Sequence, residues 1–135
     1  MDTTRRSISY WHDSLPEGEL ETKRPTLPGD VEADVAIVGA GFTGLWTAYY
    51  LTQRDSSLRI VVLEKDFAGF GASGRNGGWA SGLLPTSWEH IAAESSRDEA
   101  LRFQRTANEA VDEVGKVAAD EGIDGHFAKG GYLRV

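Results

Sequence analysis

The chain has 135 residues, which is room for one domain with a modest core but not for separate cofactor and substrate domains. Its net charge of -7 and its pI near 4.9 would repel a phosphate backbone, so nucleic acid is excluded as a partner. The absence of cysteine excludes disulfides, a thiolate nucleophile and a cysteine-based metal site.

The first thirty residues are polar and are broken by prolines and glycines. This composition predicts an extended arm over residues 1–30, ahead of a domain over residues 31–135. Tyr10 and Trp11 are expected to pin the arm by covering an apolar patch. The chain start lacks the apolar core of a secretory signal, which favours a cytoplasmic location.

The centre of the chain predicts one βαβ unit. A short apolar run at 34–38 is followed by glycine, as is typical of a buried parallel strand. A helix is expected from Thr43 to the turn at 54–57, and residues 58–63 predict a second strand. The crossover should be right-handed, and the fold class is α/β with a parallel sheet. This explains the uncharged stretch 35–53, with its three glycines, better than a membrane span does.

The residues after the second strand predict a loop and then a long helix. Residues 67–82 contain six glycines, too many for a regular helix. Apolar residues near helical spacing predict an amphipathic helix over 97–121 that ends at Gly122, although Gly115 lies inside it. A glycine pair before residues 132–135 predicts a turn into a further strand.

The main functional signal is the sequence Gly39-Ala-Gly-Phe-Thr-Gly44 between the first strand and the helix. Gly39 permits a tight turn, Gly41 lets a pyrophosphate approach the backbone, and Gly44 allows close helix–strand packing. The phosphates would lie at the helix N-terminus, where free amides and the helix dipole favour negative charge. We therefore predict a dinucleotide site in a Rossmann-like domain.

Glu64 follows the second strand, where an acidic residue would accept hydrogen bonds from the adenosine ribose hydroxyls. An acid here disfavours the additional phosphate of NADP. These features leave FAD and NAD both open, because the two share the same ADP half. The residues predicted to contact that half are Gly39, Gly41, Phe42, Thr43, Gly44, Glu64 and Lys65.

A second motif, Gly71-Ala-Ser-Gly-Arg-Asn-Gly-Gly78, distinguishes between FAD and NAD as the predicted cofactor. With the first motif, it resembles the D-amino-acid oxidase-like FAD-dependent oxidoreductases, in the form of bacterial members similar to γ-glutamylputrescine oxidoreductase. The resemblance implies FAD contacts from this loop. Arg75 offers a charged fork to phosphate oxygens, while Ser73 and Asn76 add neutral hydrogen bonds. The implied contact residues are Ser73, Gly74, Arg75, Asn76 and Gly77.

The resemblance also implies the reaction. It is the oxidation of a small-molecule amine or amino acid by hydride transfer to the flavin. The resemblance covers only the N-terminal portion of such an enzyme, so we expect an incomplete domain, assign no catalytic residue and expect no turnover by the isolated chain. Two alternatives stay open: the NAD-binding domain of a dehydrogenase, and a non-catalytic dinucleotide-binding module.

The three histidines do not form a metal site. His12, His90 and His126 are far apart in sequence and lack metal-ligand spacing. Each is expected to be solvated or hydrogen-bonded, and no metal is predicted.

Overall fold

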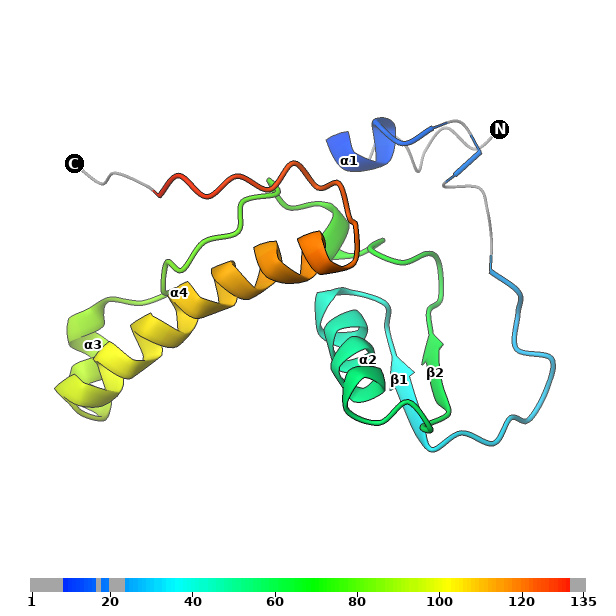
Figure 1. Ribbon diagram of the computed structural model, residues 1–135, viewed down its shortest axis with the longest axis horizontal. Helices are drawn as coiled ribbons and strands as arrows, with labels where there is room; N and C mark the ends of the chain where they lie inside the picture. The colour runs from blue at the N-terminus through cyan, green and yellow to red at the C-terminus, as the bar shows by residue number, and fades with distance from the viewer. Residues whose placement is uncertain (1–8, 17, 20–23, 132–135) are drawn as a thin grey trace. The chain divides into compact units, whose positions relative to one another are not determined.

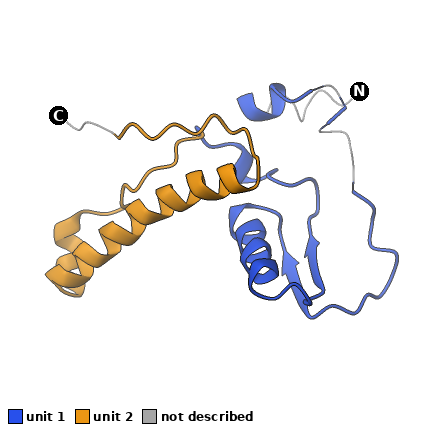
Figure 2. Ribbon diagram, viewed as in Figure 1, with its two compact units in different colours: residues 1–77 blue, residues 78–135 orange. Residues whose placement is uncertain are grey.

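The computed structural model describes residues 9–16, 18–19 and 24–131 (Figure 1). The chain divides into two compact units, residues 1–77 and residues 78–135 (Figure 2). The strand predicted after Gly131 lies outside the described residues. Among the residues that are described, no helix combines the length and the apolar character needed to cross a membrane.

The first unit contains the predicted βαβ arrangement (Figure 1). Strands β1 (Val35–Val38) and β2 (Ile60–Leu63) form a parallel two-stranded sheet, in a register that places Val35 opposite Ile60. Their residues are mostly Val and Ile, which favour strands. Helix α2 (Phe42–Arg54) connects them and packs against both strands. The predicted order of elements is confirmed, although β2 begins two residues later than expected.

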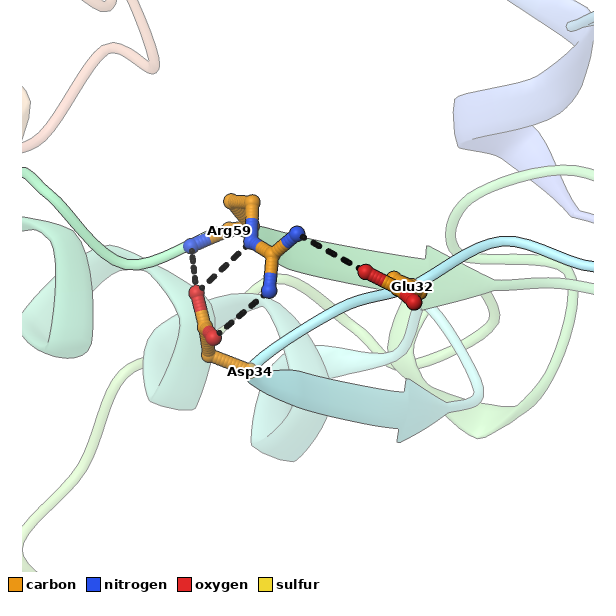
Figure 3. A network of polar contacts seen from close by, with 3 residues as sticks. All are labelled: Glu32, Asp34 and Arg59. Atoms are coloured by element: carbon orange, nitrogen blue, oxygen red, sulfur yellow. Dashed lines mark hydrogen bonds and ion pairs between the residues drawn. The ribbon is translucent and has the colours of Figure 1, made fainter.

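A charged cluster holds together the end at which the chain enters the two strands (Figure 3). The Asp34 carboxylate accepts hydrogen bonds from the backbone amide, Nε and Nη2 of Arg59 at 2.8, 3.1 and 3.0 Å. Glu32 Oε2 lies 3.7 Å from Arg59 Nη1. These contacts, led by the side-chain hydrogen bond from Arg59, lower the pKa of Asp34 to about 2. The cluster therefore fastens the sheet at the end away from the glycine turn.

Two short helical turns correct the prediction of extended or irregular chain. Helix α1 (Tyr10–Asp13) lies within the predicted arm, and it forms because Ser9 Oγ accepts a hydrogen bond from the His12 amide at 3.2 Å. A 3₁₀ turn, η2 (Ala72–Gly74), interrupts the glycine-rich loop. A turn this short tolerates glycine, since it needs only one or two hydrogen bonds.

The second unit contains helices α3 (Trp88–Glu94) and α4 (Arg97–Asp120), which pack against each other. The sequence predicted α4 with nearly the same bounds. Ser96 caps its start, and Gly122 follows its end with φ 65°, a left-handed conformation that favours glycine. Helix α3 was not predicted, because seven residues are too few to show a clear period.

Gly115 has a packing role inside α4. A Cβ atom at this position would lie 2.3 Å from Cε1 of Phe127, so only glycine leaves room for the ring. The residue that weakened the helix prediction is thus the one that lets the following segment pack against α4.

Candidate functional site

The glycine turn, which we define as residues 39–44, has the geometry expected of a tight strand-to-helix connection. Gly39 has φ 99°, and its amide donates to Leu63 O at 2.7 Å, which extends the β1–β2 pairing by one bond. A Cβ at Gly44 would lie 2.1 Å from Gly39 O and 3.2 Å from Ile37 Cγ2. Helix α2 therefore approaches β1 as closely as the sequence predicted.

Backbone donors at the start of α2 point to a site for an anion. Gly41 is the N-cap residue and supplies no side-chain cap. The amide of Phe42 donates to Ser73 Oγ at 2.9 Å. Those of Thr43 and Gly44 form no hydrogen bond within the described residues. Free amides at the positive end of a helix dipole fit a phosphate group.

Glu64 is fixed beside this turn. Its Oε2 accepts a hydrogen bond from the Ala40 amide at 2.8 Å, and its Oε1 accepts one from the Asp66 amide at 3.0 Å. These bonds, with that from Ala40 as the largest cause, lower the pKa of Glu64, so the carboxylate is charged at neutral pH. Each oxygen has a second lone pair, which leaves capacity for a ribose hydroxyl. Lys65 follows and is exposed.

The second loop, which we define as residues 69–77, is shaped by its own side chains. Arg75 Nε donates to Phe70 O at 2.8 Å, and the guanidinium carbon lies 4.8 Å from the centre of the Phe70 ring. Asn76 Nδ2 donates to Ser73 O at 2.6 Å. These contacts leave the exposed Nη groups of Arg75 available for a ligand. The expectation that this loop contacts FAD stays a prediction.

The two predicted motifs meet at Ser73. Its Oγ accepts a hydrogen bond from the Phe42 amide, and a Cβ at Gly41 would lie 3.0 Å from the same oxygen. The missing side chain of Gly41 therefore lets the second loop approach the start of α2. Gly74 is equally constrained, since a Cβ there would lie 2.2 Å from Gly69 O. Gly77 is exposed and has open space around it.

The N-terminal arm makes contacts with the second loop that the sequence did not predict. Ser9 Oγ donates to Gly74 O at 2.7 Å, and Trp11 Nε1 donates to Asn76 O at 2.6 Å. Tyr10 was expected to cover an apolar patch, but it is 73% exposed. Trp11 does pin the arm, through a hydrogen bond that no local pattern signals.

His12 also differs from expectation. It was predicted to be solvated or hydrogen-bonded, but it is only 4% exposed, and its Nδ1 has no hydrogen-bond partner among the described residues. Its ring lies edge-on to Phe67, with 5.1 Å between centroids. Packing against Phe67 and against Gly74 of the second loop buries it. His90 and His126 are exposed and lie 3.3 and 3.4 Å from Glu94 and Asp124.

Comparisons with known proteins find oxidoreductases that are similar in sequence to this chain. The chain is 30% identical over 122 residues to a probable oxidoreductase OrdL of Haemophilus influenzae, a match that covers 90% of this chain and 27% of that protein. It is 49% identical over 53 residues to γ-glutamylputrescine oxidoreductase of Escherichia coli, covering 39% and 12%. It is 51% identical over 43 residues to sarcosine oxidase subunit beta of Rhizobium meliloti, covering 32% and 10%.

The match to the Haemophilus protein covers most of this chain, and each of the three matches covers a small part of the relative. The chain spans about a quarter of the length of the Haemophilus protein. No solved structure matches the chain significantly. A family model described as FAD dependent oxidoreductase matches residues 34–135, which include the glycine turn, Glu64 and the second loop. The chain therefore belongs to the family of FAD-dependent oxidoreductases.

Proposed function

We propose that the chain is the FAD-binding portion of a flavin-dependent oxidoreductase that oxidises an amine or amino acid by hydride transfer to the flavin. The observation that carries the cofactor assignment is the hydrogen bond from the Phe42 amide to Ser73 Oγ. This bond joins a phosphate-binding turn to a second loop whose exposed residues include an arginine. A site for the ADP half alone would not need the second loop.

Each part of the site has a distinct role in this proposal. The amides of Thr43 and Gly44 bind the phosphates, while Glu64 accepts hydrogen bonds from the adenosine ribose. Arg75 reaches toward phosphate oxygens on the flavin side with its Nη groups. The proposed cofactor-binding residues are Gly39, Gly41, Phe42, Thr43, Gly44, Glu64, Lys65, Ser73, Gly74, Arg75, Asn76 and Gly77.

The substrate class rests on the relatives. Two of them are named for γ-glutamylputrescine and sarcosine, and both compounds contain an amine nitrogen. Bound FAD supplies the electron acceptor for such an oxidation. The residues of this chain bind and orient the cofactor, and we assign none of them to the substrate.

The architecture supports a Rossmann-like domain. A parallel strand pair with a crossover helix, a glycine turn at its carboxyl end and an acid after β2 is the unit from which such domains are built. We propose that residues 31–135 belong to this domain and that residues 1–30 are an N-terminal arm.

Binding titrations of the purified chain with FAD, ADP-ribose and NAD test the cofactor assignment. We expect FAD to bind most tightly, and Arg75→Ala to weaken FAD by about tenfold, the size of a lost charge-assisted hydrogen bond. Arg105→Ala is the matched control, because Arg105 is exposed on α4, in the other unit. Equal affinity for all three ligands, unchanged by Arg75→Ala, would contradict FAD specificity and leave only a generic ADP site.

Anaerobic reduction of bound FAD tests the reaction. Loss of oxidised flavin absorbance with sarcosine, but not with an alcohol of similar size, would support amine oxidation. Loss with neither compound is the result that we expect of the isolated chain, whereas loss with both compounds would contradict specificity for amines.

A further inference from the structure

The segment Ser9–His12 lies against the second loop and forms three kinds of contact with it. Ser9 Oγ donates to Gly74 O, and the indole of Trp11 donates to Asn76 O. The His12 ring is buried beside Gly74, edge-on to Phe67. The two hydrogen bonds each join residues 65 positions apart in the sequence. Non-specific hydrophobic contact alone would not satisfy two carbonyls of one loop, those of Gly74 and Asn76.

The fit between His12 and the loop depends on Gly74. A Cβ on Gly74 would lie 2.8 Å from His12 Nε2, closer than ordinary contact allows. The second loop therefore has no side chain at the point where the histidine ring approaches. The arm and the second loop are therefore joined by the packing of His12 against Gly74 as well as by the two hydrogen bonds.

The bond from Trp11 also fixes the direction of a backbone donor. The peptide between Asn76 and Gly77 is trans, so its N–H points opposite to its C=O. Because the Asn76 carbonyl is directed at the Trp11 indole, the Gly77 amide is directed away from the arm. Gly77 is exposed, and its amide has no hydrogen bond within the described residues. The arm thus presents a free donor on the opposite face of the loop.

We propose that Ser9–His12 is a positioning clamp for the cofactor loop and that Trp11 is its main positioning residue. The hydrogen bonds of the clamp occupy the carbonyl oxygens of Gly74 and Asn76, which would otherwise repel phosphate or flavin oxygens. The clamp also directs the Gly77 amide outward, toward the cofactor. It acts through the loop and does not itself contact the reacting atoms. The role in FAD binding rests on the proposed function, whereas the hold on the loop does not.

The experiment compares Trp11→Phe with Tyr10→Phe in the whole chain. Trp11→Phe removes the indole donor but keeps an aromatic ring, while Tyr10→Phe removes an exposed hydroxyl that has no hydrogen bond in the described residues. The first readout, without ligand, is the rate of tryptic cleavage after Arg75 relative to cleavage after Arg54. The second readout is the affinity for FAD relative to AMP, which needs only the glycine turn and Glu64.

We expect Trp11→Phe to speed cleavage after Arg75 by roughly threefold to tenfold, as loss of one hydrogen bond would, with the rate after Arg54 unchanged. FAD affinity should fall by roughly threefold while AMP affinity is unchanged, a split that general destabilisation would not produce. Tyr10→Phe should change neither readout.

Each other outcome decides a separate point. Unchanged cleavage after Arg75 would overturn the clamp. Faster cleavage with unchanged FAD affinity would overturn its role in cofactor positioning. A wild-type chain that binds no FAD would refute the proposed function and the positioning role, while the cleavage rates would still decide whether Ser9–His12 holds the loop.

Discussion

The glycine turn and the second loop both contain glycines that their backbones require, but they differ in what else holds them. The requirement comes from the positive φ of Gly39 and the contact of Gly44 with Gly39 O in the turn, and from the positive φ of Gly69 and the contact of Gly74 with Gly69 O in the loop. The second loop is held mainly by side chains, including Arg75 from within and Trp11 from the arm. Both motifs can be recognised in the sequence, but the contacts that distant side chains make with the second loop cannot.

Adding one methyl group to the glycine turn should have the largest effect on stability. Gly44→Ala gains about 1 kcal/mol of helix propensity. It also forces a Cβ to within 2.1 Å of a backbone oxygen, so α2 must move away from β1. We expect a net loss of about 3 kcal/mol in the free energy of unfolding, measured by urea denaturation.

Gly71→Ala is the matched control in the second loop. A Cβ at Gly71 meets nothing within 4 Å, so stability should change little. Equal destabilisation by both variants would show that glycine content, and not the local contact of Gly44, determines stability.

Removing the hydroxyl that joins the two regions should have a smaller effect. Ser73→Ala leaves the Phe42 amide without its acceptor. Because this hydrogen bond is exposed, water will replace part of it, and we expect a loss of about 1 kcal/mol or less in stability. FAD affinity measured by titration should fall by roughly threefold, for the same reason.

Ser56→Ala provides the control, since Ser56 lies in the exposed turn after α2. If Ser73→Ala left both stability and FAD affinity unchanged, the two loops would be independent. The glycine turn and the second loop would then be two separate sites.

Lowering the pH should weaken the contacts that hold the glycine turn but not those that hold the second loop. Glu64 accepts a hydrogen bond from the Ala40 amide, which lowers the pKa of the Glu64 carboxyl from 4.5. The contribution of Glu64 to the free energy of unfolding is therefore complete above pH 4.5 and disappears as the pH falls through the folded pKa. The hydrogen bonds that hold the second loop involve no carboxylate. We expect Glu64→Gln to reduce the pH dependence of stability below pH 4.5.

Asp34→Asn separates this effect from that of the charged cluster. The pKa of Asp34 is about 2, so its contribution should be lost at lower pH, between about 4 and 2. Urea denaturation from pH 7 to pH 2 would resolve the two carboxylates. An unchanged acid profile in Glu64→Gln would contradict a role for Glu64 in holding the turn.

The sequence predicted the parts of the fold that have a local cause. The apolar strand runs, Gly39 and Gly44 led to the βαβ unit, and helical periodicity together with Gly122 led to α4. Helices α1 and α3 were missed because four and seven residues are too few to establish a period. Their serine caps are visible in the sequence, but many exposed serines precede no helix.

The sequence predicted which residues form the site, but it did not predict the contacts between them. The bond between Phe42 and Ser73 spans 31 positions, and that between Trp11 and Asn76 spans 65. No periodic or turn signal connects residues at such separations. The burial of His12 likewise depends on the absence of a side chain at Gly74, and that requirement is visible only in three dimensions.

The hydrogen bonds that hold the glycine turn affect both the rate at which a ligand binds and the conformational entropy that is lost on binding. Gly39 donates to Leu63 O, Ala40 donates to Glu64, and Gly69 donates to Ala40 O at 2.9 Å, so groups of the protein itself hold the turn. Little conformational entropy is therefore left to lose when a nucleotide arrives at the turn. Association with the adenine half should proceed in a single step near the rate of diffusional encounter, without a slower loop-closing phase.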